Sequence, residues 1–110
     1  MKTASAKAKG RRGAQLAAKI LQDLYKNKIM IASSGTNGED LTIIRHPDDL
    51  NVVFSVEVKN QEKLNLLDAW GQCVANCPEG SVPLLCHTKN KQEHMLCTIK
   101  LEDLVRLLKK

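Results

Sequence analysis

Aromatic residues are scarce in this sequence, and long apolar runs are missing. The 110 residues include one Trp, one Tyr and one Phe, so that aromatic residues make up 3% of the chain. A core built by this chain is therefore aliphatic and small. No apolar run approaches the roughly 18 residues that a membrane-spanning helix needs, and we expect no membrane partner. The length fits one soluble domain and excludes a second large one.

Acidic residues are nearly absent from the first quarter of the chain. Residues 1–28 contain eight of the 17 basic residues and one of the 12 acidic residues, while the formal net charge of the whole chain is +5. This basic front favours a partner with a phosphate backbone or an anionic surface. A solvated tail that only aids solubility is the alternative interpretation.

The beginning of the chain lacks the apolar stretch typical of a secretory signal, so we expect an intracellular location. Thiols stay reduced there, and we expect the four cysteines to form no disulfide. The spacing of Cys73, Cys77, Cys86 and Cys97 matches no zinc finger or ribbon, and small core residues are the better interpretation.

Apolar periodicity divides the chain into a basic flexible arm over residues 1–12 and a single domain over residues 13–110. Leu16, Ile20 and Leu24 predict a helix from about residue 13 to residue 25. The later elements that we expect are strands over 39–44 and 51–59, a helix whose apolar face holds Leu66, Leu67, Trp70, Cys73, Val74 and Cys77, strands over 81–88 and 94–101, and a helix over 102–108. This order predicts an α/β domain with a central mixed β-sheet flanked by helices.

The strand over residues 51–59 carries the first sign of chemistry. Side chains alternate along a strand, so Glu57 and Lys59 share one face while Val56 and Val58 share the other, which is core. A carboxylate and an amine are costly to bury unless they are paired or bind something. A polar face turned to water is the simpler alternative.

The predicted hairpin adds a second carboxylate to this face. If the chain turns at Asp48 and Asp49, Asp40 lies directly opposite Glu57. Two like charges so placed destabilise a structural hairpin, but their oxygens suit a divalent cation. A register slip of one residue would turn Asp40 to the wrong face.

Four blocks of the sequence carry a family resemblance, which spans residues 10–108. The blocks are residues 10–15, residues 34–40 with Gly38-Glu39-Asp40, residues 57–63 with Glu57-Val58-Lys59, and Trp70 with Gln72. In this order they resemble the PD-(D/E)XK nuclease superfamily, and more closely small phage-encoded endonucleases related to archaeal-type Holliday junction resolvases.

The resemblance implies a restriction-endonuclease-like core and a Mg²⁺-dependent endonuclease, with Mn²⁺ as a substitute, inside a bacterial or archaeal cell. Its implied substrate is branched DNA such as a four-way junction, cut by a homodimer. Asp40 and Glu57 would hold the metal with the backbone carbonyl of Val58, and Lys59 would orient or polarise the attacking water. Gln15 stands where relatives commonly place an acidic ligand, and its amide could hold a metal-bound water.

Several further residues are candidates for the same site. Gln72 matches a glutamine that relatives turn toward the site, although an exposed helical Gln is an equal alternative. The predicted contacts with DNA phosphates come from Lys9, Arg11, Arg12, Ser33, Ser34 and Gly35. Two other functions stay open, an endonuclease acting on linear duplex or nicked DNA and a non-catalytic DNA-binding protein.

Overall fold

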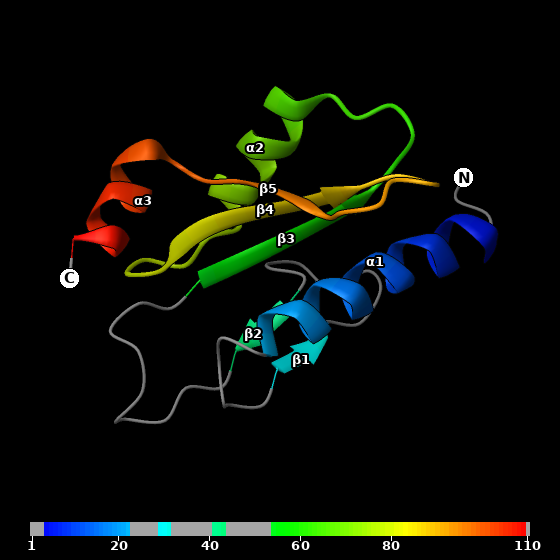
Figure 1. The fold of residues 1–110 in the computed structure, drawn as a ribbon, viewed down its shortest axis with the longest axis horizontal. Coiled ribbons are helices and arrows are strands. Elements are labelled where there is room, and N and C mark those ends of the chain that lie inside the picture. Colours follow the sequence, from blue (N-terminus) through cyan, green and yellow to red (C-terminus); the bar gives the residue numbers. More distant parts are fainter. Residues whose placement is uncertain (1–3, 23–28, 32–40, 44–53, 110) are drawn as a thin grey trace.

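The computed structural model describes residues 4–22, 29–31, 41–43 and 54–109 (Figure 1). In chain order the described elements are α1 (Ala4–Gln22), β1 (Ile29–Ile31), β2 (Leu41–Ile43), β3 (Phe54–Asn60), α2 (Leu66–Ala75), β4 (Val82–Thr88), β5 (Leu96–Thr98) and α3 (Leu101–Leu108). The α/β class is therefore confirmed. The order differs from the predicted one by β1, a short apolar stretch that we did not count as a strand.

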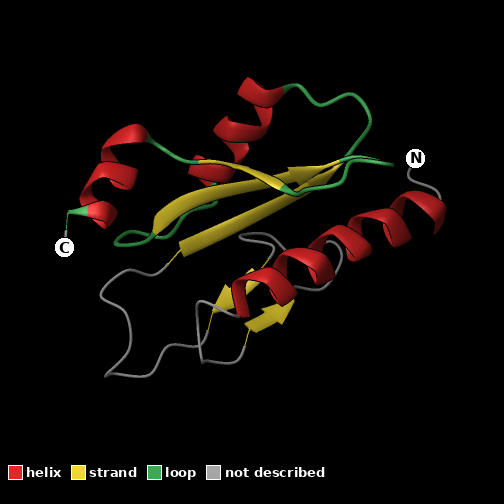
Figure 2. Cartoon of the chain, in the orientation of Figure 1, coloured by secondary structure: helices red, strands yellow, loops and turns green. Residues whose placement is uncertain are grey.

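The strands form one mixed sheet in the order β1-β2-β3-β4-β5. β3 and β4 run parallel, and the other neighbouring pairs are antiparallel. Parallel strands need a crossover connection, which α2 supplies here. Figure 2 shows α1 on one side of the sheet and α2 on the other.

β3 is covered on both faces, which decides how its side chains are used. Val56 packs in a cluster with Ala17 of α1, whereas Leu85 packs with Cys73 of α2. Glu57 lies beside Leu85 in the parallel register, so it faces α2. The polar face of β3 is therefore buried under a helix, and the alternative in which it faces water is wrong.

Residues 4–12, which the sequence predicts as a flexible arm, form the first turns of α1. Ala and Lys alternate in this segment, and both are strong helix formers even without an apolar stripe. Asn60 at the end of β3 ties this part of the helix to the sheet, since its side-chain amide donates a 2.9 Å hydrogen bond to the Lys9 carbonyl.

The apolar face predicted for α2 is only partly the face that packs on the sheet. Ala69 and Cys73 are buried, but Leu66, Leu67 and Val74 are exposed. The helix begins after Asn65, whose side chain accepts a 3.1 Å hydrogen bond from the Asp68 backbone N–H as an N-cap. The apolar face that the sequence predicts for α2 is therefore wider than the part that packs on the sheet.

None of the helices in the described part of the chain is long and apolar enough to cross a bilayer.

Candidate functional site

Glu57 is the buried charge at the centre of the candidate site. Alternation along β3 turns it toward α2, and the whole residue is 5% exposed. Asn76, which caps the C-terminus of α2, donates a hydrogen bond of 3.3 Å to Glu57 Oε1. Lys59 Nζ lies 3.8 Å from Glu57 Oε2. This separation exceeds the 2.7–2.9 Å typical of a charge-assisted hydrogen bond, so the two groups are neighbours without a tight ion pair.

The Cys73 thiol of α2 lies near Glu57, and its pKa is affected by that carboxylate. Burial, together with the smaller effects of the charges on Glu57 and Cys77, raises the pKa of the Cys73 thiol from 9.0 to about 12. The thiol is thus a neutral packing group at physiological pH, not a nucleophile. It closes the apolar side of the site, while Lys59 and Asn76 approach Glu57 from its polar side.

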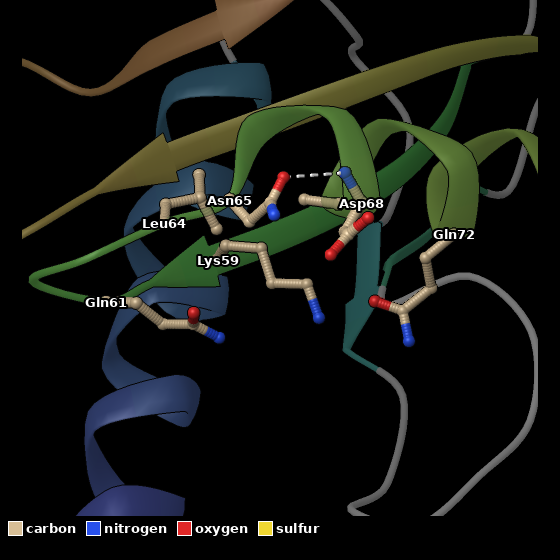
Figure 3. Close-up of a pocket in the computed structure, with 7 residues that line it drawn as sticks. Lys59, Gln61, Leu64, Asn65, Asp68 and Gln72 are labelled. Carbon is tan, nitrogen blue, oxygen red and sulfur yellow. Dashed lines mark hydrogen bonds between the residues drawn. The ribbon is translucent and has the colours of Figure 1, made fainter.

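Lys59 extends from this buried region into a cavity of about 300 Å³ between the end of β3 and the start of α2. Its side chain is 21% exposed, against 7% for the side chain of Glu57. Figure 3 shows the polar ends of Lys59, Asp68 and Gln72 facing the same open space. The described lining of the cavity is Lys59, Gln61, Leu64, Asn65, Asp68, Ala69 and Gln72. The lining therefore presents one ammonium, one carboxylate and three amides beside the buried carboxylate of Glu57.

The structure brings three of the predicted site residues together and leaves another apart. Glu57 and Lys59 are neighbours, and Gln72 shares the cavity with Lys59. Val58 lies between them on β3, with its side chain in the core on the α1 side. Gln15 is exposed on α1, which packs against the opposite face of the sheet, and it is not part of the described cavity lining.

Asp40, Ser33, Ser34 and Gly35 lie outside the described residues. The neighbouring register is described, however, and it pairs Leu41 of β2 with Val56 of β3 in antiparallel orientation. This is the register from which the sequence pattern places Asp40 opposite Glu57. The prediction for Asp40 itself is untested.

The predicted DNA contacts Lys9, Arg11 and Arg12 lie on α1. Arg11 and Arg12 are exposed, while Lys9 is half-buried and its carbonyl accepts the hydrogen bond from Asn60. Basic side chains on a helix keep a defined spacing, in contrast to the same side chains on a flexible arm. The packing of α1 on β3 sets the backbone positions of these residues relative to the strand.

Two residues near the site were missed by the sequence pattern. Asn76 follows Gln72 by four positions, a spacing that puts both on one side of a helix, and this signal could have found it. Asp68 precedes Gln72 by the same interval and lines the cavity. Asp68 lies in the first turn of α2 and Asn76 is its C-cap, positions that are usually assigned a structural role alone.

The four cysteines were predicted to be core residues, but only two of them are buried. Cys73 and Cys86 are buried as expected, but Cys77 is half-buried and Cys97 is exposed. No group of three His, Cys, Asp or Glu side chains that could hold a metal occurs among the residues that the structure describes. The fold and site geometry above stand alone, because comparisons with protein-family models, curated proteins and solved structures find no match.

Proposed function

We propose that this chain is a metal-dependent endonuclease with a restriction-endonuclease-like core, which hydrolyses phosphodiester bonds in branched DNA such as a four-way junction. One observation carries the proposal. The Glu57 carboxylate is buried beside the ammonium group of Lys59, and Lys59 lines a cavity. A buried carboxylate and an amine beside a cavity are typical of binding and catalytic sites.

The donor set fits a hard divalent cation. Carboxylate and carbonyl oxygens are the ligands that Mg²⁺ and Mn²⁺ prefer, and Asp40, Glu57 and the Val58 carbonyl would supply them. The described pairing of Leu41 with Val56 supports this set, because continuing it by one residue would bring Asp40 opposite Glu57. When bound, the ion supplies charge neutralisation at the scissile phosphate and activation of water.

The chain's own side chains position the substrate. Lys59 brings a positive charge to the mouth of the cavity, where it can bind a phosphate oxygen and orient the attacking water. Gln72 is placed to hold water or a phosphate oxygen by hydrogen bonding through its amide. Asn76 holds Glu57 in place through its hydrogen bond to the carboxylate.

Phosphate contacts from α1 would position the duplex arms. The exposed Arg11 and Arg12, with Lys9 beside them, present guanidinium and ammonium groups from a helix that is tied to the end of β3. Ser33, Ser34 and Gly35 are proposed to add hydroxyl and backbone contacts. A two-fold dimer inside the cell would deliver the paired cuts that a four-way junction requires.

A non-catalytic DNA-binding protein is the second candidate. It is favoured by the internal partners of Glu57, because Lys59 and Asn76 can stabilise a purely structural carboxylate. In that case the buried cluster would hold β3 to α2, and the basic α1 would account for DNA binding alone.

Cleavage of a synthetic four-way junction, compared with a linear duplex and a nicked duplex of the same sequence, separates these functions. We expect Mg²⁺-dependent, symmetric nicks in the junction, none in EDTA, and loss of cutting with retained binding in Lys59→Ala. Lys63→Ala, an exposed lysine just beyond β3, serves as the matched control. Equal cutting of linear or nicked duplex would redirect the proposal to those substrates, and binding without cutting in Mg²⁺ would favour the non-catalytic candidate.

A further inference from the structure

The C-terminal helix α3 has its apolar face turned outward. Leu101, Leu104, Val105 and Leu108 are exposed, two of them by 70% or more, whereas Asp103 is 8% exposed. Amphipathic helices of globular domains normally bury the apolar stripe and expose the charges. α3 instead leaves these four apolar residues exposed and buries Asp103, so an apolar area remains on its outer face.

One apolar side chain joins the inward face of α3 to the domain, and a polar contact lies within the helix. Asp103 accepts a 2.8 Å hydrogen bond from Arg106 within an ion pair on the same helix. Leu107 packs against the core cluster that contains Phe54 and Val82. With Leu107 packed against the core, Leu101, Leu104, Val105 and Leu108 stay exposed.

β5 carries a further exposed apolar residue at the sheet edge. It is the last strand in the described sheet order, and it leads into α3 through two residues (Figure 1). Leu96 on β5 is 52% exposed. We refer to Leu96, Leu101, Leu104, Val105 and Leu108 as the C-terminal surface. An apolar surface beside a sheet edge is characteristic of an association site.

The charges that flank the C-terminal surface indicate what covers it. Glu102 is exposed in the first turn of α3 and Lys109 caps its C-terminus, whereas Asp103 is buried and pairs with Arg106. In an antiparallel, two-fold pairing of two copies, the acidic first turn of each helix meets the basic end of the other. DNA fits poorly, because the exposed side chains at the centre of the surface are apolar.

We propose that the C-terminal surface is the isologous interface of a homodimer, in which two α3 helices pack antiparallel. The pairing would cover the outward leucines of both copies and bring Glu102 near Lys109 of the second copy. The inference rests on the exposure and charge of α3, and it stands whether or not the chain cleaves DNA. In the proposed nuclease, this interface would bring the active sites of two chains together in one dimer.

Sedimentation equilibrium of the full chain tests the interface. We expect wild type at twice the 12.2 kDa chain mass and a Leu101→Glu, Leu108→Glu variant at the chain mass, with unchanged far-UV circular dichroism. Charges buried in an apolar interface raise the dimer dissociation constant by about 100-fold or more. The matched control is Leu66→Glu, Leu67→Glu on α2, which adds the same charges to another exposed apolar pair and keeps the dimer. A monomeric wild type, or an equal effect of the control, would overturn the proposal.

A charge exchange tests the antiparallel orientation. Glu102→Lys and Lys109→Glu should each weaken the dimer by about fivefold, and the double variant should restore wild-type association. Failure of the double variant to recover would overturn the antiparallel arrangement. Both tests measure mass alone, so an inactive but dimeric protein would refute the nuclease and leave the interface standing.

Discussion

At the scale of the residue, Glu57 combines burial, a negative charge and a loose cationic neighbour. These features cost stability when no cation is bound, because a carboxylate loses its hydration shell in the interior. Sites that bind ions or substrates commonly carry such a cost. Glu57→Gln separates the stability cost of the buried charge from its role in binding an ion, since the amide has nearly the same shape as the carboxylate and no charge.

We expect Glu57→Gln to raise the free energy of unfolding in EDTA by about 1 kcal/mol, because it removes a buried charge while keeping the packing. Mg²⁺ should raise the urea midpoint of wild type and leave that of the variant unchanged, since the ion stabilises only a chain that binds it. Urea unfolding with and without Mg²⁺ measures both effects. Glu62→Gln, an exposed control, should behave as wild type. A variant less stable than wild type in EDTA would show that Glu57 is a structural group.

Asn76 is predicted to act through Glu57. Asn76→Ala removes the donor that lies 3.3 Å from Glu57 Oε1. The carboxylate then loses a hydrogen bond that contributes about 1 kcal/mol to holding it in its orientation. We expect kcat of junction cleavage to fall about fivefold to tenfold with little change in KM, because the residue acts on the carboxylate and not on the DNA. Asn90→Ala in the turn after β4 is the matched control. A rise in KM with unchanged kcat would place Asn76 at the substrate.

The buried thiols give the stability a pH dependence. Burial is the main cause that raises the pKa of both Cys73 and Cys86 from 9.0 to about 12, so the unfolded chain loses these protons more readily than the folded one. Their contribution is therefore complete below pH 9 and is lost as the pH rises toward 12. We expect the free energy of unfolding to fall by on the order of 1 kcal/mol per pH unit for each thiol across this window.

Urea unfolding at several pH values across that window measures the fall. A Cys73→Ala, Cys86→Ala variant keeps the other titrating groups, and we expect it to show a shallower decline. An equal decline in the variant and the wild type would assign the effect to other groups.

Residue-level reasoning found the charged face of β3 but missed part of its support. The alternation of Val56, Glu57 and Val58 is visible in the sequence, and the structure confirms that Val56 and Val58 face the core. Asn76 was not predicted, because its role depends on how far α2 extends over β3. The spacing of four from Gln72 indicates the side of the helix on which Asn76 lies, but only the packing of α2 on β3 brings it to Glu57.

At the scale of the element, α1 and β3 approach each other at Gly13. A Cβ added there would lie 3.0 Å from Asn60 Cβ and 3.4 Å from Val58 Cγ1, while one added at Gly10 would meet nothing within 4 Å. Gly10→Ala should therefore raise the free energy of unfolding by about 0.8 kcal/mol through helix propensity alone. Gly13→Ala should lower it, because Cβ of Asn60 is fixed by the strand.

Thermal or urea unfolding measures the stability of the two variants, which carry the same Gly→Ala substitution at two positions of α1. Stabilisation by both substitutions would mean that α1 can move away from β3. Destabilisation by both would mean that the first turns of α1 contribute little helix.

The elements differ in how well the sequence predicted them. β3, β4 and the antiparallel pairing of β2 with β3 were predicted, because alternation and turn residues are local signals. The first turns of α1 were missed, since Ala and Lys carry no apolar period. The buried face of α2 was drawn too wide, because a sequence shows an apolar arc and not the part that the sheet covers.

At the scale of the whole molecule, basic charge gathers on α1 while apolar surface gathers on α3. We expect DNA binding to weaken steeply with salt, since Lys and Arg release counterions from phosphates. Arg11→Ala, Arg12→Ala should reduce the slope of log K against log salt by about 0.9 for each phosphate that the two arginines neutralise in the wild type. Fluorescence anisotropy across a salt series measures the slope. Lys89→Ala, Lys91→Ala between β4 and β5 is the control, and an equal reduction there would mean that α1 has no special role.

The anomalous difference map of a crystal soaked in Mn²⁺ tests the shared ion site most directly. We expect one peak between the carboxylates of Asp40 and Glu57, with oxygens at about 2.1 Å and the Lys59 ammonium alongside. A map from Glu57→Gln crystals should lack this peak. Manganese bound elsewhere, or no peak at these carboxylates in the soaked wild-type crystal, would contradict the site.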